Sequence, residues 1–191
     1  MSSRRHMLER LATMSMFAAI SIVLVALIRI PMFLPFLEYD PADIPILLGG
    51  IFFGPAAGLL LTVVVSAIHS LLFSPGSGII GFIMHVIATG GMTVISSLIF
   101  RSGKNKIGNR HVRLSIALTA GALFMFLSMI PMNLLLTPIY TNMSAAEIWK
   151  QFMFVGIIPF NFLKATINSL AAFFLYPIIC KAIQGKIWGS K

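Results

Sequence analysis

Long apolar runs, rather than alternating apolar and polar positions, dominate this chain. A helix needs about 20 apolar residues to cross the hydrocarbon layer of a membrane, and most of the runs approach that length. The pattern predicts six helices, of which the second is short for a full span, at 7–30, 43–50, 56–73, 79–100, 114–136 and 152–183. We therefore expect an all-α integral membrane protein, a bundle of six transmembrane helices, with residues 1–191 forming one domain.

Prolines and polar residues mark the breaks between the runs. The segment 31–41 contains three prolines, which remove backbone donors and favour extended neighbours, so it cannot form a regular helix. Asp43 is placed to cap the second helix. In the loop before the last run, a short surface helix is predicted from Ser144, with Glu147 helping to cap it.

Composition supports a membrane location. The chain is 58% hydrophobic and 10% charged, with a mean hydropathy of +0.97. A soluble domain of this size needs far more charge to cover its surface. The basic N-terminal segment and the apolar run after it could form a signal peptide, but no small-residue cleavage site follows. We interpret this run as a retained first helix.

The distribution of charge predicts the orientation in the membrane. The net charge is +9, and most Lys and Arg residues fall in three clusters, at 4–10, 101–113 and 181–191. These clusters lie between or beside the apolar runs, as the positive-inside rule expects of cytoplasmic segments, which argues against nucleic acid as a partner. We expect a multi-pass protein of the cell membrane, in contact with lipid, with both termini in the cytoplasm.

The sequence lacks the motifs of an enzyme. It contains no nucleophile elbow, P-loop or zinc-protease helix, so any energy from ATP must come from a partner. The single cysteine, Cys180, excludes an intrachain disulfide and a cysteine-based metal site. His69 and His85 stand in helices that hold no carboxylate. We expect hydrogen-bonded interior histidines there, with no metal site and no bound cofactor.

Lys164 is the most informative residue of the last predicted helix. A cation deep in a membrane helix costs a few kcal/mol, so such charges usually face a cavity or a partner. Asn161 and Asn168 lie on nearly the same face of this helix. The functional interpretation is that Lys164 and Asn161 contact a ligand. The alternatives are a paired or snorkelling lysine and amides that join helices, which suits the deeper Asn168 better.

Asn133 stands alone among apolar residues of the fifth predicted helix. Its amide offers a donor and an acceptor, which suits a ligand with an amide-like edge. The alternative is a packing hydrogen bond across the bundle. Thr137 lies one turn further on and Tyr140 follows, so all three are candidate substrate contacts.

Acidic residues gather in the loop before the second helix. Loop carboxylates such as Asp40 are commonly solvated, and Asp43 is a predicted cap. Together with Tyr39 in a proline-stiffened loop, they could instead form a lid over a substrate site. A calcium loop is disfavoured because the glycine and the terminal glutamate of an EF-hand are absent.

The first predicted helix carries small residues on one face, among them Ser15 and Ala19. Small residues let helices approach closely within lipid. The face could serve packing inside the bundle or docking to another membrane subunit, and spacing alone favours internal packing.

Four segments together resemble one transporter family. The segment 37–58 is similar to the riboflavin-specific S components of energy-coupling factor (ECF) transporters, the RibU family. Shorter similarities lie at 76–85, 133–140 and 159–164, so that the resemblance covers nearly the whole chain.

The resemblance implies a six-helix bundle of the ECF S-component type, which captures riboflavin from outside and pairs with a transmembrane coupling subunit and two ATPase subunits. It implies flavin contacts from Asn133, Asn161 and Lys164, with the loop from Tyr39 to Asp43 and Gly78 closing the site. The family's coupling surface includes an Ala-x-x-x-Ala pattern on the first helix. Here that pattern would correspond to Ser15 and Ala19, with Ser15 in place of the first alanine.

The implied ligand fits the residues. A flavin has a flat apolar ring system, a polar edge and a polyhydroxyl tail, which apolar walls, amides and a lysine can bind. The alternatives are an S component for flavin phosphate or another vitamin, since a basic side chain also suits an anion, and a non-transporting membrane assembly protein.

Overall fold

The computed structural model describes residues 2–73 and 78–187. Nearly all of these residues are helical. In chain order the elements are α1 (Ser2–Leu27), β1 (Ile30–Met32), β2 (Leu34–Tyr39), α2 (Asp43–Phe53), α3 (Pro55–Leu72), α4 (Gly78–His85), η1 (Val86–Gly90), α5 (Gly91–Ser102), η2 (Gly103–Asn105), α6 (Arg110–Thr141), α7 (Ala145–Glu147), η3 (Ile148–Ile157) and α8 (Ile158–Ile187). The η1 and η3 segments are π-helical, and η2 is a turn of 3-10 helix.

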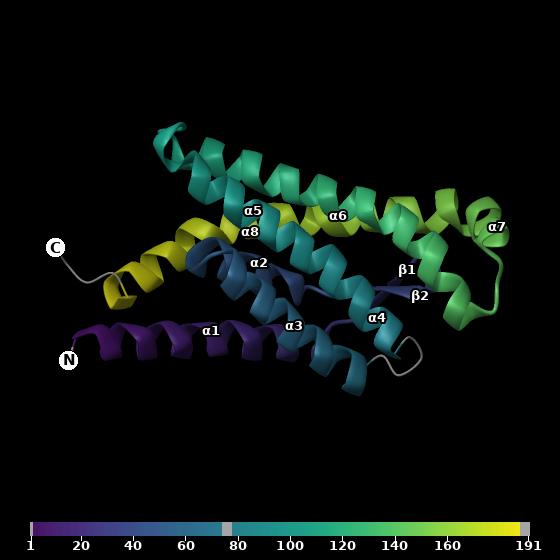
Figure 1. Cartoon of the computed structure of the whole chain (residues 1–191), viewed down its shortest axis with the longest axis horizontal. Coiled ribbons are helices and arrows are strands. Elements are labelled where there is room, and N and C mark those ends of the chain that lie inside the picture. The colour runs from purple at the N-terminus through teal and green to yellow at the C-terminus, as the bar shows by residue number, and fades with distance from the viewer. Residues whose placement is uncertain (1, 74–77, 188–191) are drawn as a thin grey trace.

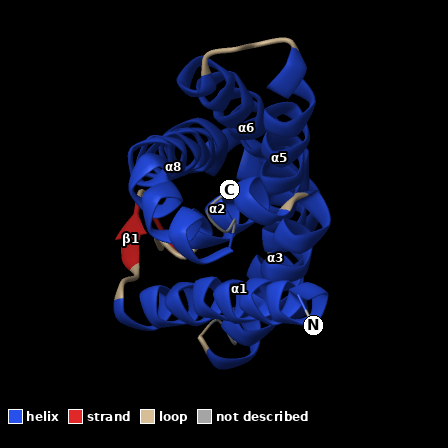
Figure 2. Ribbon diagram, turned by 90° about the vertical axis from the view of Figure 1, so that its left-hand side faces the viewer, coloured by secondary structure: helices blue, strands red, loops and turns tan. Residues whose placement is uncertain are grey.

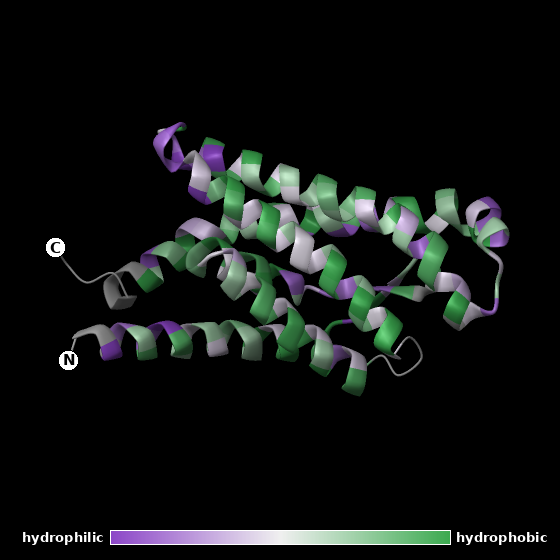
Figure 3. Ribbon diagram, viewed as in Figure 1, coloured by the Kyte–Doolittle hydropathy of each residue, from purple (hydrophilic) through white to green (hydrophobic). Residues whose placement is uncertain are grey.

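The long helices run side by side along the long axis of the molecule (Figure 1). Both chain ends and the α5–α6 connection lie at one end of the bundle, which we call the basic end because it carries the Lys and Arg clusters. The β1–β2 hairpin and α7 lie at the opposite end, which we call the hairpin end. Green, hydrophobic residues cover most of the length between the two ends (Figure 3).

Five helical segments of the described chain are long and apolar enough to cross a membrane, and α2 is a shorter apolar helix. Large apolar side chains on the outside of the bundle, such as those of Leu71, Leu127 and Phe174, are exposed. Such a surface is stable in lipid and not in water. The protein is a multi-pass membrane protein, and the prediction of six helical segments is confirmed.

The short helix α2 fills the middle of the bundle. Figure 2, an end-on view, shows it surrounded by α1, α3, α5, α6 and α8. Ten of its 11 residues are buried, so α2 is apolar around almost its whole circumference, as a core helix must be. Its expected end at residue 50 is wrong, since the helix continues to Phe53.

Close backbone approaches hold α2 in place. Gly50 of α2 and Gly58 of α3 pack against each other and against the side chain of Thr93 of α5, so that a Cβ atom at either glycine would collide with Thr93. At the single-residue junction between α2 and α3, Gly54 has a φ of +106°, which favours glycine. The apolar core around these contacts joins residues of α1, α2, α3, α5, α6 and α8.

The proline-rich segment forms the antiparallel hairpin of β1 and β2, in agreement with the prediction that it is not helical. Leu37 and Tyr39 of the hairpin join a second apolar cluster with η3 and α8. The capping box of Ser144 and Glu147 is confirmed, since the Ser144 hydroxyl accepts from the Glu147 backbone N–H and the Glu147 carboxylate accepts from the Ser144 N–H.

Candidate functional site

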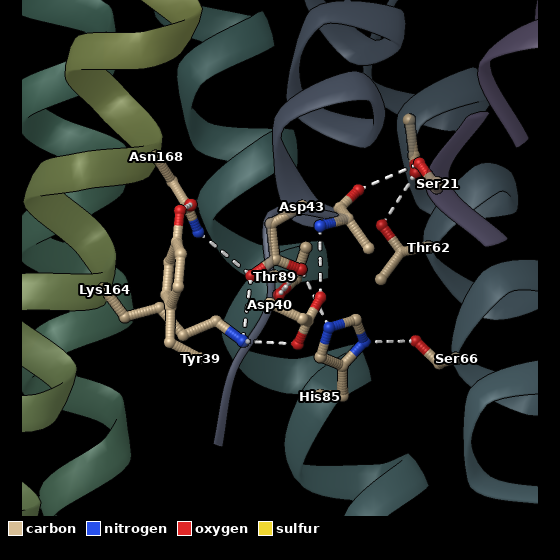
Figure 4. Close-up of polar contacts among 12 residues, drawn as sticks. Ser21, Tyr39, Asp40, Asp43, Thr62, Ser66, His85, Thr89, Lys164 and Asn168 are labelled. Atoms are coloured by element: carbon tan, nitrogen blue, oxygen red, sulfur yellow. Dashed lines mark hydrogen bonds and ion pairs between the residues drawn. The ribbon is translucent and has the colours of Figure 1, made fainter. Parts of the chain in front are cut away.

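Three charged side chains meet inside the bundle, near its hairpin end. Asp40 follows β2, Asp43 begins α2, and Lys164 lies in α8; their exposed fractions are 3%, 1% and 7%. The Nζ atom of Lys164 lies 3.4 Å from Oδ2 of Asp40 and 3.2 Å from Oδ2 of Asp43 (Figure 4). Buried charges require such pairing because removing them from water is costly. The cluster therefore ties the hairpin, the central helix and the last helix together.

Asp43 is the centre of this cluster. Its Oδ1 accepts from Nε2 of His85 at 2.8 Å and from the hydroxyl of Thr89 at 2.9 Å. Its Oδ2 accepts from Nδ2 of Asn168 at 3.0 Å, beside the Lys164 ammonium. The prediction that Asp43 caps α2 is wrong, since the N-cap residue is Ala42 and no side chain caps this helix. The carboxylate instead points across the bundle to α4, η1 and α8.

The backbone between the two aspartates is fixed by hydrogen bonds. Oδ1 of Asp40 accepts from the Ala42 N–H at 3.1 Å, and the carbonyl of Ala42 accepts from the Ser21 hydroxyl of α1 at 2.8 Å. These bonds hold the turn that directs both carboxylates toward Lys164.

Tyr39 extends the cluster toward the hairpin. Its hydroxyl donates to Oδ1 of Asn168 at 3.2 Å (Figure 4). Burial raises the pKa of the Tyr39 phenol, so the hydroxyl keeps its proton and remains a donor. Asn168 thus joins the hairpin to Asp43, which agrees with the structural role expected for it.

His85 connects the cluster to α3. Its Nδ1 lies 2.6 Å from the hydroxyl of Ser66. A neutral imidazole with its proton on Nε2 would donate to Asp43 and accept from Ser66, which satisfies both ring nitrogens. The ring of His69 lies 5.9 Å from that of His85, in an edge-on arrangement. The interior, hydrogen-bonded position expected of His85 is confirmed, but Asp43 supplies the carboxylate that the sequence pattern did not place beside it.

A cavity of about 140 Å³ borders the charged cluster. It lies between α3, α4, η1, α6 and α8 and is lined by both polar and apolar side chains. The polar ones include those of Ser66, His69, Asn161 and Lys164, and the apolar ones include those of Met125 and Phe160. Ser70, near the end of α3, and Phe82, near the start of α4, also line it, which places part of its wall at the hairpin end.

Lys164 and Asn161 therefore share a cavity wall, as their spacing predicts. The Lys164 ammonium contacts two carboxylates, so the alternative of a paired lysine is also realised. An ammonium has three donors. Among the described residues these carboxylates are its partners, which leaves one donor for a ligand. Asn161 donates through Nδ2 to the Ile157 carbonyl at 2.8 Å, which leaves its amide oxygen and second N–H.

The remaining candidates lie elsewhere. Asn133 and Thr137 are buried in α6 and bond to each other at 3.1 Å, and Asn133 also donates to the Met129 carbonyl. Neither lines the cavity in this structure. Gly78 begins α4 with a φ of +48°, and the side chain of Tyr140 lies outside the described part of the chain.

Ser15 and Ala19 are exposed on the outer face of α1. The internal-packing interpretation of this pair is therefore wrong. Among neighbouring residues of α1, Met14, Phe17 and Ser21 turn inward instead.

The parts of the site that depend on long-range contacts could not be predicted from the sequence. His69, His85, Ser66 and Thr89 border the cavity or bind Asp43, yet each is ordinary in its local sequence. The available signal was their position: His69, His85 and Thr89 are polar residues within apolar runs, which predicts interior hydrogen bonds without identifying Asp43 as a partner.

Comparisons with known proteins agree with this architecture. The model of a protein family, the substrate-specific component of ECF transporters, matches residues 9–176. A riboflavin transporter, RibU, of Staphylococcus aureus (strain TCH60) is 30% identical over 173 residues, which cover 88% of each chain. A solved structure of the S component of a bacterial ECF transporter superposes with a TM-score of 0.74 at 28% identity, covering 92% of this chain and 97% of that one.

Proposed function

Because the chain belongs to the family of substrate-specific (S) components of ECF transporters, we propose that it captures riboflavin from outside the cell and delivers it with an ATPase-driven coupling module. S components are transport proteins and not enzymes. The riboflavin assignment draws support from the similar riboflavin transporter and from the chemistry of the cavity beside Lys164.

The observation that carries the proposal is the position of the Lys164 ammonium, at the wall of a cavity and between two buried carboxylates. Asp40 and Asp43 hold the charge within the membrane, and the remaining donor is available to a carbonyl or hydroxyl oxygen of the ligand.

The cavity walls suit a flat heteroaromatic ring. Met125, Met129 and Phe160 provide apolar and polarisable surface. Asn161 offers a donor and an acceptor to the polar edge of a flavin, and the Ser66 hydroxyl also lines the cavity. This mixture of apolar walls with a few polar groups is typical of small-molecule sites.

The local charge favours a ligand without negative charge. Two carboxylates and one ammonium leave the cluster negative when His85 is neutral. A flavin phosphate would bring further negative charge close to this cluster, whereas riboflavin carries none. The same imbalance favours a second candidate, a cationic vitamin, and competition experiments separate the two.

Binding requires the site to enlarge. A cavity of about 140 Å³ is smaller than the roughly 300–1,000 Å³ of typical small-molecule pockets. Leu37 and Tyr39 of the β1–β2 hairpin pack in one apolar cluster with residues of η3 and with Phe160, which lines the cavity. We propose that a movement of this hairpin opens the site and that its return buries the ligand. Asp40, which comes directly after β2 in the chain, would move with the hairpin.

The orientation and the partner surface follow from the charge and from α1. The basic end of the bundle faces the cytoplasm in this proposal, as the positive-inside rule expects, so the hairpin end faces outside. The exposed small residues Ser15 and Ala19 would then dock the transmembrane coupling subunit, which in turn binds two ATPase subunits.

Titration of the purified protein with riboflavin, followed by flavin fluorescence, tests the proposal. We expect saturable binding of one riboflavin per chain below micromolar concentration, with flavin mononucleotide competing at least tenfold less well. Displacement by a cationic vitamin, with no response to riboflavin, would support the second candidate. An absence of binding to any of these would refute a vitamin-capturing role.

A further inference from the structure

A second cavity lies at the basic end of the bundle, remote from Lys164. It measures about 500 Å³, so it is larger than the cavity at the charged cluster. The end of α2, the α5–η2 segment, the start of α6 and the last part of α8 surround it. The proposed capture of riboflavin near the hairpin end makes no use of this cavity.

The floor of this cavity is aromatic, and its rings are buried or partly buried. The rings of Phe52 and Tyr176 stack with centroids 5.1 Å apart, and Phe100 meets Tyr176 edge-on at 5.5 Å. Ile51 and Ile183 complete the apolar wall and are themselves buried. This surface would accept the apolar part of an amphiphilic ligand.

Four cations stand around this floor. Arg101, Lys104 and Arg110 are exposed, and Arg113 is half-buried with its guanidinium 4.6 Å from the centre of the Phe100 ring. Arg110 reaches the sulfur of Cys180, at 3.7 Å, and Arg101 donates to the Phe52 carbonyl at 3.2 Å. These contacts hold the guanidinium groups of Arg110 and Arg101 at the edge of the cavity.

The positive charge is not balanced within the described residues. None of the ion pairs found there includes any of the four cations, and no acidic residue lines the cavity. The Nε atom of Arg113 is buried and has no hydrogen-bond acceptor among the described residues. A buried donor without an acceptor is uncommon in a folded protein, and its natural partner is an anion.

We propose that this cavity binds a phosphate group, supplied by an anionic phospholipid of the adjacent leaflet. The phosphodiester would lie among Arg110, Arg113 and Lys104. The glycerol, or the part of an acyl chain next to it, would lie against the floor formed by Phe52 and Tyr176. Arginine matches the geometry of phosphate oxygens by paired N–H donors. A lipid is favoured over a soluble phosphate because the cavity combines the cations with an apolar floor at the membrane boundary.

Native mass spectrometry tests this proposal. The full chain would be released from mixed micelles that contain equal amounts of phosphatidylglycerol and phosphatidylcholine. We expect one phosphatidylglycerol to be retained with at least tenfold preference over phosphatidylcholine. The double variant R110Q/R113Q should lose about tenfold or more of that preference, because each cation near an anionic lipid contributes measurably to its binding.

The matched control is K106Q/K181Q, which removes two exposed cations from the same end outside the cavity wall. It should retain the preference; an equal loss in this variant would show a general effect of surface charge and overturn the proposal. If R110Q/R113Q does not fold, as judged by size-exclusion chromatography, the rim variant R101Q/K104Q provides the same test with more exposed residues.

A second arm distinguishes the source of the phosphate. Inorganic phosphate and flavin mononucleotide would be added at millimolar concentration to the same samples. Binding of either one that depends on Arg110 and Arg113, without a preference for phosphatidylglycerol, would assign the site to a soluble phosphate and overturn the lipid assignment. If neither lipid nor soluble phosphate bound selectively, the site itself would be refuted. Both arms are independent of riboflavin binding.

Discussion

The ammonium of Lys164 and the carboxylate of Asp43 lie 3.2 Å apart, and both side chains are almost fully buried. One belongs to the last helix and the other to the central helix, so this pair links these two helices through the core. The pair also sets the charge beside the cavity. Substitutions of its members should therefore change both stability and ligand binding, in ways that can be separated.

Replacement of Lys164 by methionine should destabilise the protein strongly. The change leaves Asp40 and Asp43 without their cation, and breaking a buried ion pair from one side costs about 3–5 kcal/mol. Riboflavin affinity should also fall, by an amount equivalent to about 1–3 kcal/mol for a lost buried hydrogen bond. Thermal unfolding in detergent and flavin titration measure the two effects.

The control for Lys164→Met is Lys150→Met, which removes an exposed lysine of η3. It should change neither the thermal stability nor the riboflavin affinity. The double variant K164M/D43N should be less destabilised than the sum of its single changes, since the two residues interact directly. Strict additivity would contradict the ion pair.

Replacement of Asp43 by asparagine should destabilise the protein more than replacement of Asp40. Asp43 accepts from four side chains, whereas Asp40 has one side-chain partner and one backbone donor. An asparagine at position 43 would direct an N–H₂ group toward donors that need an acceptor, at a cost of about 1–3 kcal/mol for each group left unsatisfied.

Glu38→Gln is the matched acid-to-amide control. Glu38 is exposed and faces Arg29 at 3.8 Å, and surface ion pairs contribute only about 0–1 kcal/mol. Its thermal midpoint should stay near that of the parent protein. If replacement of Asp40 destabilised the protein more than replacement of Asp43, the central position of Asp43 in the cluster would be contradicted.

Tyr39→Phe tests the link between the hairpin and α8. It removes the hydroxyl that donates to Asn168 but keeps the ring in its apolar cluster. The loss should be about 0.5–1.5 kcal/mol, accompanied by faster hydrogen exchange in the β1–β2 hairpin. Tyr39→Ala, which also removes the ring, should accelerate exchange further; equal exchange in all three proteins would show that Tyr39 does not anchor the hairpin.

Ala19→Trp tests the docking face of α1. Ala19 is exposed, so a bulky residue there should leave folding and riboflavin binding intact while weakening co-purification with the coupling and ATPase subunits. Leu135→Trp introduces the same side chain at an exposed position of α6 and should leave the assembly unchanged. Normal assembly of both variants would place the coupling surface elsewhere.

The helices could be predicted from the sequence because their signals are local. A run of apolar residues long enough to span lipid specifies a helix whatever its neighbours are. The capping box at Ser144 and Glu147 likewise depends on residues three positions apart. The hairpin was predicted only as a break, since prolines exclude a helix without specifying which residues pair.

The charged cluster could not be assembled from sequence because its partners are far apart in the chain. Asp43 looks like a helix cap when only its neighbours are considered, and the donors that bind it come from α4, η1 and α8. Lys164 could be recognised as unusual from its apolar surroundings, but the carboxylates that hold it could not be identified. The π-helical segments η1 and η3 were not predicted either.

The most direct test of the account is riboflavin titration of Ser70→Phe, beside Ser115→Phe as control. Ser70 lines the cavity next to Lys164, whereas Ser115 is exposed on α6 away from it. We predict that Ser115→Phe binds riboflavin as the parent protein does, and that Ser70→Phe remains folded but binds at least tenfold more weakly. Undiminished affinity in Ser70→Phe would contradict the assignment of this cavity as the riboflavin site.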